Sequence, residues 1–519
     1  MKKILVILFT FLAFDGEVFA QQVPHVKWGR LYGDSTMCFS IKQNPGGTFV
    51  IGGITYSTQY HGAGTDFYYI LTDSLGNETW HLAIGGNGND TLFSVIPYRH
   101  EANSFVGCKA IGSTGSIAYT GDIWEKNGPV NGLMSGTTLF GTNAGVKTIG
   151  GSVYDVFKDI VQNASDESYT AVGWTTSSNS FDVPKNHEVA SKDVFFIKRT
   201  YTMSPITSKC YGGTGDDLGN CIATTTDGGY IIAGSTTSTD GDVTDNNGGS
   251  DFWIIKIDFN GVILWQRCYG GSGNEEANSM TETSDGGYLI VGSTASNDSD
   301  VTGNHGNTDY WVIKIEADGN LQWQKCLGGS GTDVAYSVIE RKNGDFIVAG
   351  KSNSWNGNTT LNHGGYDYWI VSVDNMGSLM WQKSLGGTAD DEARGVVETT
   401  TDDLIIGGTT WSTDGDINSN HTGSSAWLVF LGAELPTDIF ESEHSEIKIF
   451  PAEQYVTVES NAPLTGTIEI FNSFGQPVLQ KETLSTQSIV LPISSLSSGV
   501  YHIQVRTRGK TVSKTLIKK

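Results

Sequence analysis

Charged residues are scarce in this chain, and basic residues are the scarcer kind. Only 17% of the 519 residues are charged, and 32 Lys and Arg stand against 56 Asp and Glu, a formal net charge of −24. A surface this acidic cannot neutralise phosphates, which excludes nucleic acid as a partner. Long apolar runs are also missing after the first twenty residues, so no transmembrane segment is predicted.

Cysteine is rare, with six residues, and its spacing argues against disulfides. Cys210, Cys268 and Cys326 recur at intervals of 58 residues, which places them on equivalent strands of successive repeats. Such strands lie too far apart for a bridge, whose Cα atoms must approach within about 7 Å. We therefore expect free thiols.

The common enzyme signatures are absent: there is no G-x-S-x-G elbow, P-loop, Rossmann fingerprint or H-E-x-x-H zinc motif. Acidic pairs are plentiful, so a glycosidase or lyase acting through carboxylates remains the alternative to a binding protein. The acids recur in every repeat, whereas catalysis needs one unique constellation, and this weakens the enzyme hypothesis.

What the chain does have begins with an export signal. Lys2 and Lys3 precede the apolar run Ile4–Phe14, and Val18-Phe19-Ala20 fits a cleavage site. The apolar run is too short to cross a bilayer, so residues 1–20 are interpreted as a signal peptide.

The rest is organised by a repeat of 58 residues, seen clearly in Gly270–Gly329. Its first landmark is Asp-x-aromatic, which is found at Asp66–Tyr68, Asp122–Trp124, Asp193–Phe195, Asp251–Trp253, Asp309–Trp311, Asp367–Trp369 and, without the Asp, Ser425–Trp427. A second landmark is a Trp twelve residues later, at Trp80, Trp265, Trp323 and Trp381. Units two and three lack that Trp, and their spacing indicates insertions around Gly128–Gly145 and Ser177–Lys192.

Each unit contains four predicted strands. In the fourth unit these are Leu218–Thr225, Tyr230–Ser235, Phe252–Ile257 and Ile263–Cys268, with an Asp-Gly turn between the first two. Four strands repeated seven times are typical of a seven-bladed β-propeller. The last unit lacks its fourth strand, and Val26–Gly33 matches it, so an N-terminal strand is expected to close the ring at residues 21–431.

Acidic residues gather in the loops of one predicted face of the propeller. They are Asp216, Asp217, Asp240, Asp242, Asp245, Glu275, Glu276, Asp298, Asp300, Asp333, Asp390, Asp391, Asp414 and Asp416. Two interpretations stay open: a ligand face that holds calcium in its Asp-x-Asp loops, or turns whose Asp, Asn and Gly bond their own backbone. The same choice applies to the histidines of these loops, His61, His187, His305, His363 and His421.

Tryptophan also allows two roles. Trp253, Trp311, Trp369 and Trp427 repeat within a strand and are expected to pack between blades rather than to stack on sugars. Trp174, Trp355 and Trp411 lie at strand ends or in loops, and are the better candidates for exposed stacking.

The C-terminal region follows a linker at residues 432–445. Seven short strands are predicted after it, at Ile447–Phe450, Tyr455–Glu459, Gly466–Phe471, Val478–Glu482, Gln487–Leu491, Gly499–Arg506 and Thr511–Ile517. This pattern indicates a small Ig-like β-sandwich at residues 446–519.

This region resembles the type A C-terminal sorting domain of the type IX secretion system of Bacteroidota. The resemblance rests on Ile447–Pro451, Ile468–Gln476, Leu496–Val505 and Lys514–Lys519, and it departs from the family's Phe-Pro-Asn-Pro run at Ala452-Glu453. The motif positions are Gly475, Gly499, Tyr501, Lys514 and Lys518. The resemblance implies that the secretion machinery is a partner, that the domain is removed after export, and that the cargo is secreted or attached to the outer-membrane surface.

Together these features predict an all-β exported protein: a seven-bladed propeller with a small sandwich domain, acting as a binding or adhesion module for a glycan or protein ligand. The alternatives are a carbohydrate-active enzyme that uses the acidic loops, and a structural surface component that self-associates.

Overall fold

The computed structural model describes residues 23–44, 46–56, 64–100, 104–117, 120–188, 191–417, 419–432, 447–451, 455–472, 476–507 and 510–518. The chain divides into two compact units, Met1–Gly432 and Ala433–Lys519. The predicted signal peptide, residues 433–445 of the predicted linker and His61 lie outside the described residues. Gly432, the first residue of that predicted linker, is instead the last residue of a strand.

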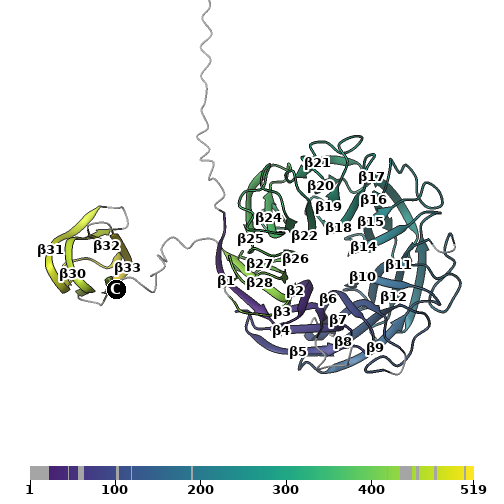
Figure 1. The fold of residues 1–519 in the computed structure, drawn as a ribbon, viewed down its shortest axis with the longest axis horizontal. Coiled ribbons are helices and arrows are strands. Elements are labelled where there is room, and N and C mark those ends of the chain that lie inside the picture. Colours follow the sequence, from purple (N-terminus) through teal and green to yellow (C-terminus); the bar gives the residue numbers. More distant parts are fainter. Residues whose placement is uncertain are drawn as a thin grey trace, which may run out of the picture. The chain divides into compact units, whose positions relative to one another are not determined.

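The first unit is a ring of four-stranded antiparallel sheets, the arrangement of a β-propeller (Figure 1). In most sheets the strands follow chain order from the centre of the ring outwards. The sheets are β2 (Thr36–Gln43), β3 (Phe49–Thr55), β4 (Asp66–Thr72) and β5 (Glu78–Ile84); β6 (Asp90–His100), β7 (Ser104–Thr114), β8 (Asn131–Thr138) and β9 (Asn143–Ile149); β10 (Asp155–Gln162), β11 (Tyr169–Thr175), β12 (Asp193–Arg199) and β13 (Pro205–Tyr211); β14 (Asp217–Thr224), β15 (Tyr230–Thr236), β16 (Asp251–Ile257) and β17 (Ile263–Tyr269); β18 (Glu275–Glu282), β19 (Tyr288–Thr294), β20 (Asp309–Ile315) and β21 (Leu321–Leu327); β22 (Asp333–Glu340), β23 (Phe346–Ser352), β24 (Asp367–Val373) and β25 (Leu379–Leu385); and β26 (Asp391–Glu398), β27 (Leu404–Thr410) and β28 (Ser425–Gly432) with β1 (His25–Tyr32).

The N-terminal strand completes the last of these sheets, in the place that the repeat predicts for it. β1 pairs antiparallel with β28 from His25↔Gly432 to Tyr32↔Ala426. Lys27 adds an ion pair to Asp403, with 2.8 Å between Nζ and Oδ1. Because β28 has a hydrogen-bonded partner on both sides, it is not an edge strand of that sheet.

The core lies between neighbouring sheets. Trp253, Trp311, Trp369 and Trp427 are at most 3% exposed, which confirms the packing role expected of them. The ring of Phe252 lies 4.5 Å, centre to centre, from that of Trp311 on the next sheet, and Tyr310 and Trp369 repeat the contact at 4.6 Å. Aromatic pairs at this separation contribute beyond the area that they bury.

The prediction that Asp122 and Trp124 mark the third strand of the second unit is wrong. Trp124 is 70% exposed, and the third strand of this sheet is β8, which starts at Asn131 where other sheets have Asp. Asp122 instead belongs to the preceding loop, where its backbone N–H bonds Gly85 O over 2.8 Å, as that of Asp242 bonds Gly212 O. β8 has no aromatic residue, and the Asp-x-aromatic motif of this unit occurs in the loop before β8 instead. Gly128–Gly145 therefore contains a strand, not an insertion, and this sheet keeps its four strands.

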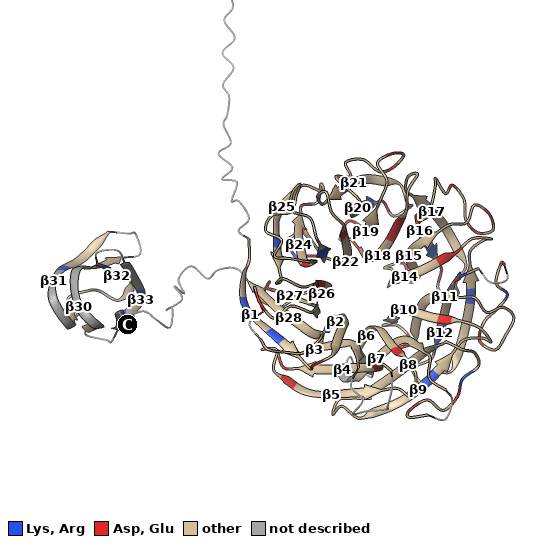
Figure 2. Cartoon of the chain, in the orientation of Figure 1, with Lys and Arg blue, Asp and Glu red and all other residues tan. Residues whose placement is uncertain are grey.

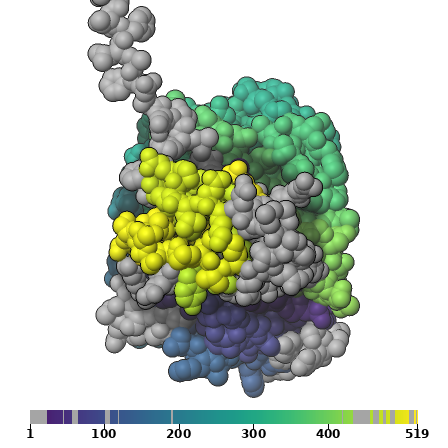
Figure 3. Space-filling model, turned by 90° about the vertical axis from the view of Figure 1, so that its left-hand side faces the viewer, coloured from purple at the N-terminus to yellow at the C-terminus, as the bar shows by residue number. Residues whose placement is uncertain are grey.

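The C-terminal unit is a single five-stranded antiparallel sheet, the part shown in yellow in Figure 3. Its strands are β29 (Ile447–Pro451), β30 (Tyr455–Asn472), β31 (Pro477–Pro492), β32 (Gly499–Thr507) and β33 (Lys510–Lys518). The prediction of seven short strands is wrong because β30 and β31 each join two of them. The register between β30 and β31 shifts between Glu459 and Leu464, so each long strand continues through an irregularity that the sequence suggests is a break.

Candidate functional site

Four of the predicted site acids begin the innermost strands and are buried. In β14, Asp217 Oδ2 accepts hydrogen bonds from Gly213 N and Ser238 Oγ, both over 2.8 Å, and Oδ1 accepts one from Thr236. The same position is held by Glu275, Asp333 and Asp391, which are 0% exposed. Each carboxylate thereby ties the loop before its own strand to the loop that follows the second strand.

The acids of the outer loops also accept bonds from the chain itself. Asp240, Asp298 and Asp414 each accept a backbone N–H across 2.8 Å, from Thr214, Ser272 and Thr388. Two residues further on, Asp242, Asp300 and Asp416 accept the N–H of Gly212, Gly270 and Gly386 over 3.0–3.2 Å. This is the turn-stabilising role that the sequence leaves open.

The remaining acids are scattered rather than gathered. Asp216 pairs with Lys192 at 2.9 Å, Asp390 accepts the Tyr366 N–H at 3.0 Å, and Glu276 accepts from Asn220 at 3.1 Å. Asp245 adopts a positive φ of 66° in its loop. Acidic residues occur on loops in several parts of the ring (Figure 2). In the part of the chain that the structure describes, no group of three or more His, Cys, Asp or Glu is placed to hold a metal ion.

The loop histidines are divided among the sheets as well. Nδ1 of His187, His305 and His363 lies 2.6 Å from Oδ2 of Asp193, Asp309 and Asp367, respectively. His421 contacts Ser412 O through Nε2 at 2.7 Å. The imidazoles of His187, His305 and His363 are thus bound to the first residue of the third strand of their own sheet, and that of His421 to the loop after β27. The described histidines do not converge. Of the candidate stacking residues, Trp355 is 66% exposed, while Trp174 and Trp411 are partly buried.

Buried carboxylates face one another between neighbouring sheets. Asp251 Oδ2 accepts the Asn247 N–H at 2.7 Å, but among the described residues its Oδ1 has no hydrogen-bond partner. That oxygen and Glu275 Oε2 lie so close to Gly270 that a Cβ there would be 2.4 and 2.7 Å from them. Burial, with the Glu275 charge adding to it, raises the pKa of Asp251 to about 6. Equivalent pairs are Asp66 with Asp90, Asp193 with Asp217, Asp309 with Asp333, and Asp367 with Asp391.

The centre of the ring holds a site that the sequence analysis missed. A cavity of about 470 Å³ is lined by all seven innermost strands. Every one of these strands has a β-bulge at its fourth residue, where the register with the second strand shifts. A bulge redirects a side chain, and here the bulged residue of each strand lines the cavity. These residues, which we call the bulge ring, are Phe39, Phe93, Lys158, Asn220, Asn278, Tyr336 and Arg394.

The bulge ring differs from sheet to sheet although its surroundings repeat. The third position is Ala or Gly in four of these strands and the fifth is Ser in four, as in β18 and β22, and the first is Asp in most sheets. The fourth position carries aromatic, cationic and amide side chains. This variation inside a repeated strand is the signal in the sequence from which the site could have been found.

Five consecutive members of the ring form an arc of aromatic and cationic contacts. Arg394 lies over the Tyr336 ring, 3.8 Å from guanidinium carbon to ring centre, and 5.8 Å from that of Phe39. Phe39 and Phe93 follow, 6.0 Å apart between ring centres, and Lys158 Nζ lies 3.9 Å from the centre of Phe93. Cation–π contacts of this kind are strongest where water is excluded.

The arc has a fixed electrostatic surrounding. Glu392 bonds Arg394 and also Lys351, the latter over 2.6 Å, so the guanidinium is held in position. Burial lowers the pKa of Lys158. On the other side of the ring the side-chain amides of Asn220 and Asn278 each donate to a carbonyl of the next strand over 2.9 Å, at Ala277 and Ala335. The ring therefore presents half-buried aromatic faces and cations on one side and amides on the other.

In the C-terminal unit, three of the predicted motif residues have distinct environments. Lys518 Nζ donates to the carbonyl of Ser494 over 3.0 Å, and also to those of Ile493 and Leu496. Tyr501 is 6% exposed and donates from its hydroxyl to Ser497 O over 2.9 Å. Lys514 is exposed, as is Gly499 at the start of β32, and Gly475 lies outside the described residues.

Comparison with known proteins separates the two parts of the chain. Residues 449–519 match the secretion system C-terminal sorting domain. The regulatory protein FlaEY of Caulobacter vibrioides is 29% identical over an alignment of 201 residues. The match covers 34% of this chain and 20% of that protein, so this chain spans only a fifth of that relative. Similar solved structures include the Neurospora crassa Pan2 WD40 domain, with 10% identity, a TM-score of 0.40 and coverage of 76% of this chain and 88% of that one. Puromycin hydrolase is similar as well, with 11% identity, a TM-score of 0.41 and coverage of 73% of this chain and 50% of that one.

The ring of sheets thus defines a β-propeller protein. Its residues 449–519 are a C-terminal sorting domain, so the protein is a cargo of the type IX secretion system with a β-rich repeat region before that domain. The sorting domain implies secretion or display at the cell surface. No helix in the described part of the chain is long and apolar enough to cross a membrane.

Proposed function

We propose that this protein is an exported binding module: a seven-bladed propeller, closed by β1, that takes a glycan or protein ligand at the bulge ring. In this proposal residues 1–20 direct inner-membrane passage and are removed. Residues 446–519, an Ig-like sorting domain joined by the linker 432–445, direct passage across the outer membrane of a member of the Bacteroidota. The mature protein is then released or held at the surface.

One observation carries the binding role: the bulge ring holds five different residue types at seven equivalent positions, in a molecule that otherwise repeats. A residue that only stabilises a blade serves equally well in every blade, as the buried Asp217, Asp333 and Asp391 do. Aromatic and cationic side chains on one side of the ring and amides on the other suit an asymmetric ligand. Aromatic faces beside cations and amides suit saccharide rings, or the apolar and acidic groups of a peptide.

The acidic loops support binding rather than hydrolysis, because their carboxylates already accept hydrogen bonds from the chain. A glycosidase needs two carboxyl groups set about 5–9.5 Å apart across a substrate, with one free to donate a proton. The seven residues of the bulge ring include no carboxylate. The two carboxylates elsewhere in the cavity lining, Asp159 and Glu282, accept hydrogen bonds from the hydroxyls of Ser94 and Thr226, respectively.

The test uses the purified full chain on a panel of insoluble polysaccharides and matrix proteins, scoring both the protein retained and the reducing ends released. Arg394→Met and Phe39→Ala should lose retention by about tenfold or more. Arg267→Met, an exposed arginine on β17, is the matched control and should be retained like the wild type. Unchanged retention of both Arg394→Met and Phe39→Ala would overturn the bulge ring as the binding site. Release of reducing sugar would overturn the binding role.

A further inference from the structure

A second cavity opens where one sheet lacks a repeated tryptophan. In regular units, this Trp of the fourth strand packs under the turn between the third and fourth strands of the next sheet. Trp80 Nε1 donates to Leu139 O at 3.0 Å, and Trp323 Nε1 to Asn375 O at 3.1 Å, each a carbonyl of that turn. In β9 the equivalent residue is Gly145. Its φ of +124° is one that side chains rarely adopt, and no described heavy atom beyond its neighbours lies within 4 Å of where its Cβ would be.

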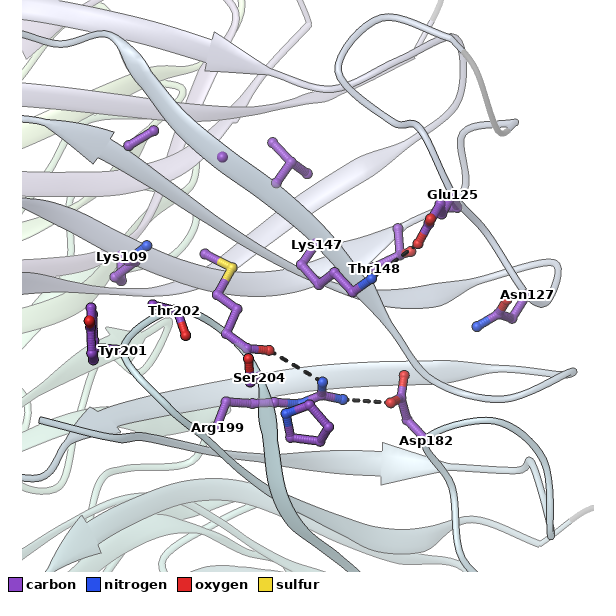
Figure 4. Close-up of a pocket in the computed structure, with 15 residues that line it drawn as sticks. Lys109, Glu125, Asn127, Lys147, Thr148, Asp182, Arg199, Tyr201, Thr202 and Ser204 are labelled. Atoms are coloured by element: carbon purple, nitrogen blue, oxygen red, sulfur yellow. Dashed lines mark hydrogen bonds and ion pairs between the residues drawn. The ribbon is translucent and has the colours of Figure 1, made fainter. Parts of the chain in front are cut away.

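The space left by the missing ring is a cavity of about 700 Å³. Its walls are the start of β9, from Ala144 to Thr148, and the turn from Tyr201 to Pro205 that would otherwise cover a tryptophan. Figure 4 shows Lys109, Tyr201 and Thr202 together on one side of it and Glu125 and Asn127 on the other. A volume of this size accommodates a small-molecule ligand.

Lys109 is the unusual member of the lining. It is 7% exposed, and its Nζ lies 5.6 and 5.8 Å from the ring centres of Tyr98 and Tyr169. Among the described residues it has no carboxylate partner, and burial is the sole cause that lowers its pKa. A buried ammonium without an anion is costly, whereas Lys256 in the next sheet but one shows the usual solution, an ion pair with Asp227 at 2.7 Å.

The other charges of the cavity are already paired. Arg199, 3% exposed, bonds Asp182 at 2.6 Å and also holds the turn through Met203 O at 3.4 Å. Lys147 pairs with Glu125 at 3.0 Å. One buried positive charge is therefore left without compensation, and it borders a space large enough for the missing anion to be supplied from outside.

We propose that this cavity binds an acidic saccharide whose carboxylate meets the Lys109 ammonium. The polar groups of Asn127, Thr202 and Ser204 line the space where sugar hydroxyls would lie, and Tyr201, 47% exposed, provides an aromatic face at its edge. The site is separate from the bulge ring and does not depend on the function proposed there. It gives an exported propeller a second, charge-selective contact with an extracellular polysaccharide.

A purely structural role for Lys109 predicts something different. Replacing a buried, unpaired cation with an apolar side chain of similar length is neutral or stabilising. Lys109→Met should therefore have an unchanged or higher Tm while it loses the anion. A structural lysine would show the reverse, a lower Tm with ligand binding intact.

The experiment is calorimetric titration of the purified full chain with tri-galacturonate and, in parallel, with neutral galactotriose at low salt. The acidic trisaccharide should bind the wild type and bind Lys109→Met at least about tenfold more weakly, the loss expected for one charge-assisted contact. Lys325→Met, which removes an exposed lysine of β21, should bind normally. Arg394→Met, the bulge-ring variant, should also bind tri-galacturonate with the affinity of the wild type.

Several results would overturn the proposal: no heat with tri-galacturonate, equal affinity for the neutral sugar, or equal affinity of Lys109→Met and wild type. Because the Tm of each variant is measured alongside, a loss caused by misfolding is recognised by a lowered Tm. In that case Lys109→Gln, which keeps a polar head without the charge, decides between loss of charge and loss of fold.

Discussion

The side-chain amide of Asn131 donates from Nδ2 to Asp155 Oδ2 over 3.2 Å between two sheets of the ring. Its Oδ1 accepts the N–H groups of Asn127 and Gly128 over 3.0 and 2.9 Å. We call such a contact between neighbouring sheets a seam. Five other seams have two acidic residues where this one has Asn131 and Asp155, as Asp251 and Glu275 show. The molecule thus contains its own comparison between a hydrogen-bonded amide–carboxylate pair and a repelling carboxylate pair.

Asp251→Asn should therefore stabilise the propeller at neutral pH. The new amide can accept the Asn247 N–H and donate to Glu275, as Asn131 does for Asp155, and we expect about 1–2 kcal/mol more stability at pH 7.5. The reciprocal change, Asn131→Asp, should lower the Tm by creating a further repelling pair. Thermal unfolding of both variants measures this, and a lower Tm for Asp251→Asn would contradict the role assigned to the seam.

The stability of the propeller should fall as the pH rises from about 4 to about 6.5 and change little above that. Burial raises the pKa values of Asp217, Asp251 and Asp367 to about 6, above the ordinary value near 4, so the folded state binds protons more tightly in this window. Raised pKa values give stability at low pH that is lost as pH rises through the folded pKa. A Tm measured every half pH unit tests this, and a Tm that rises steadily toward neutrality would refute it.

Acid should destabilise the same molecule below about pH 4 through different groups. Burial alone would raise the pKa of Asp227, but the hydrogen bond from Lys256 lowers it to about 2; in Asp285, bonds from Thr283 and Lys314 have the same effect. The contribution of these two carboxylates to the stability of the fold is present above the ordinary Asp pKa near 4, and it is lost as the pH falls toward 2. Lys256→Met should reduce this acid-side loss and leave the slope between about pH 4 and 6.5 unchanged.

Calcium removal should leave the propeller unaffected. The loop acids already accept backbone N–H groups, as Asp240 and Asp414 do, and an ion that binds only the folded state would have to displace these bonds. We expect Tm values with calcium and with EDTA to agree within about 1 °C, because a site occupied at a hundred times its Kd would add about 2.7 kcal/mol. A clear calcium-dependent rise in Tm would restore the loops as a metal site.

Lys518 should be needed for a stable sorting domain and hence for export. Its ammonium is the shared donor to the carbonyls of Ile493, Ser494 and Leu496. Lys518→Met therefore leaves the acceptors of the buried Ile493 and the half-buried Leu496 unpaired, at a cost of about 1–3 kcal/mol. Immunoblots of medium, surface and periplasm should show the variant retained in the periplasm. The exposed Lys514→Met is the control, and equal export of the two would show that the carbonyl contacts are dispensable.

Local pattern was sufficient for most elements. The Asp-Gly turns and the alternating apolar residues predicted β14 to β17 to within one residue at each end, because those features act over a few neighbouring residues. The same local reasoning failed where two segments share a motif, as at Asp122, and where β30 and β31 run on through an irregularity. In both places the outcome depends on which distant strand supplies the hydrogen bonds.

By itself, the sequence determined the repeat, the four-strand unit, the place of the N-terminal strand and the presence of a sorting domain, since each follows from periodicity or a contiguous motif. Only the tertiary structure decided which residues meet. Arg394 and Tyr336 belong to neighbouring innermost strands, and they touch because a bulge in each strand turns both side chains into the channel. Lys109 faces an empty space because Gly145, on another strand, lacks the ring that would fill it. Such contacts arise from the closure of the ring, which brings together side chains that no local pattern relates.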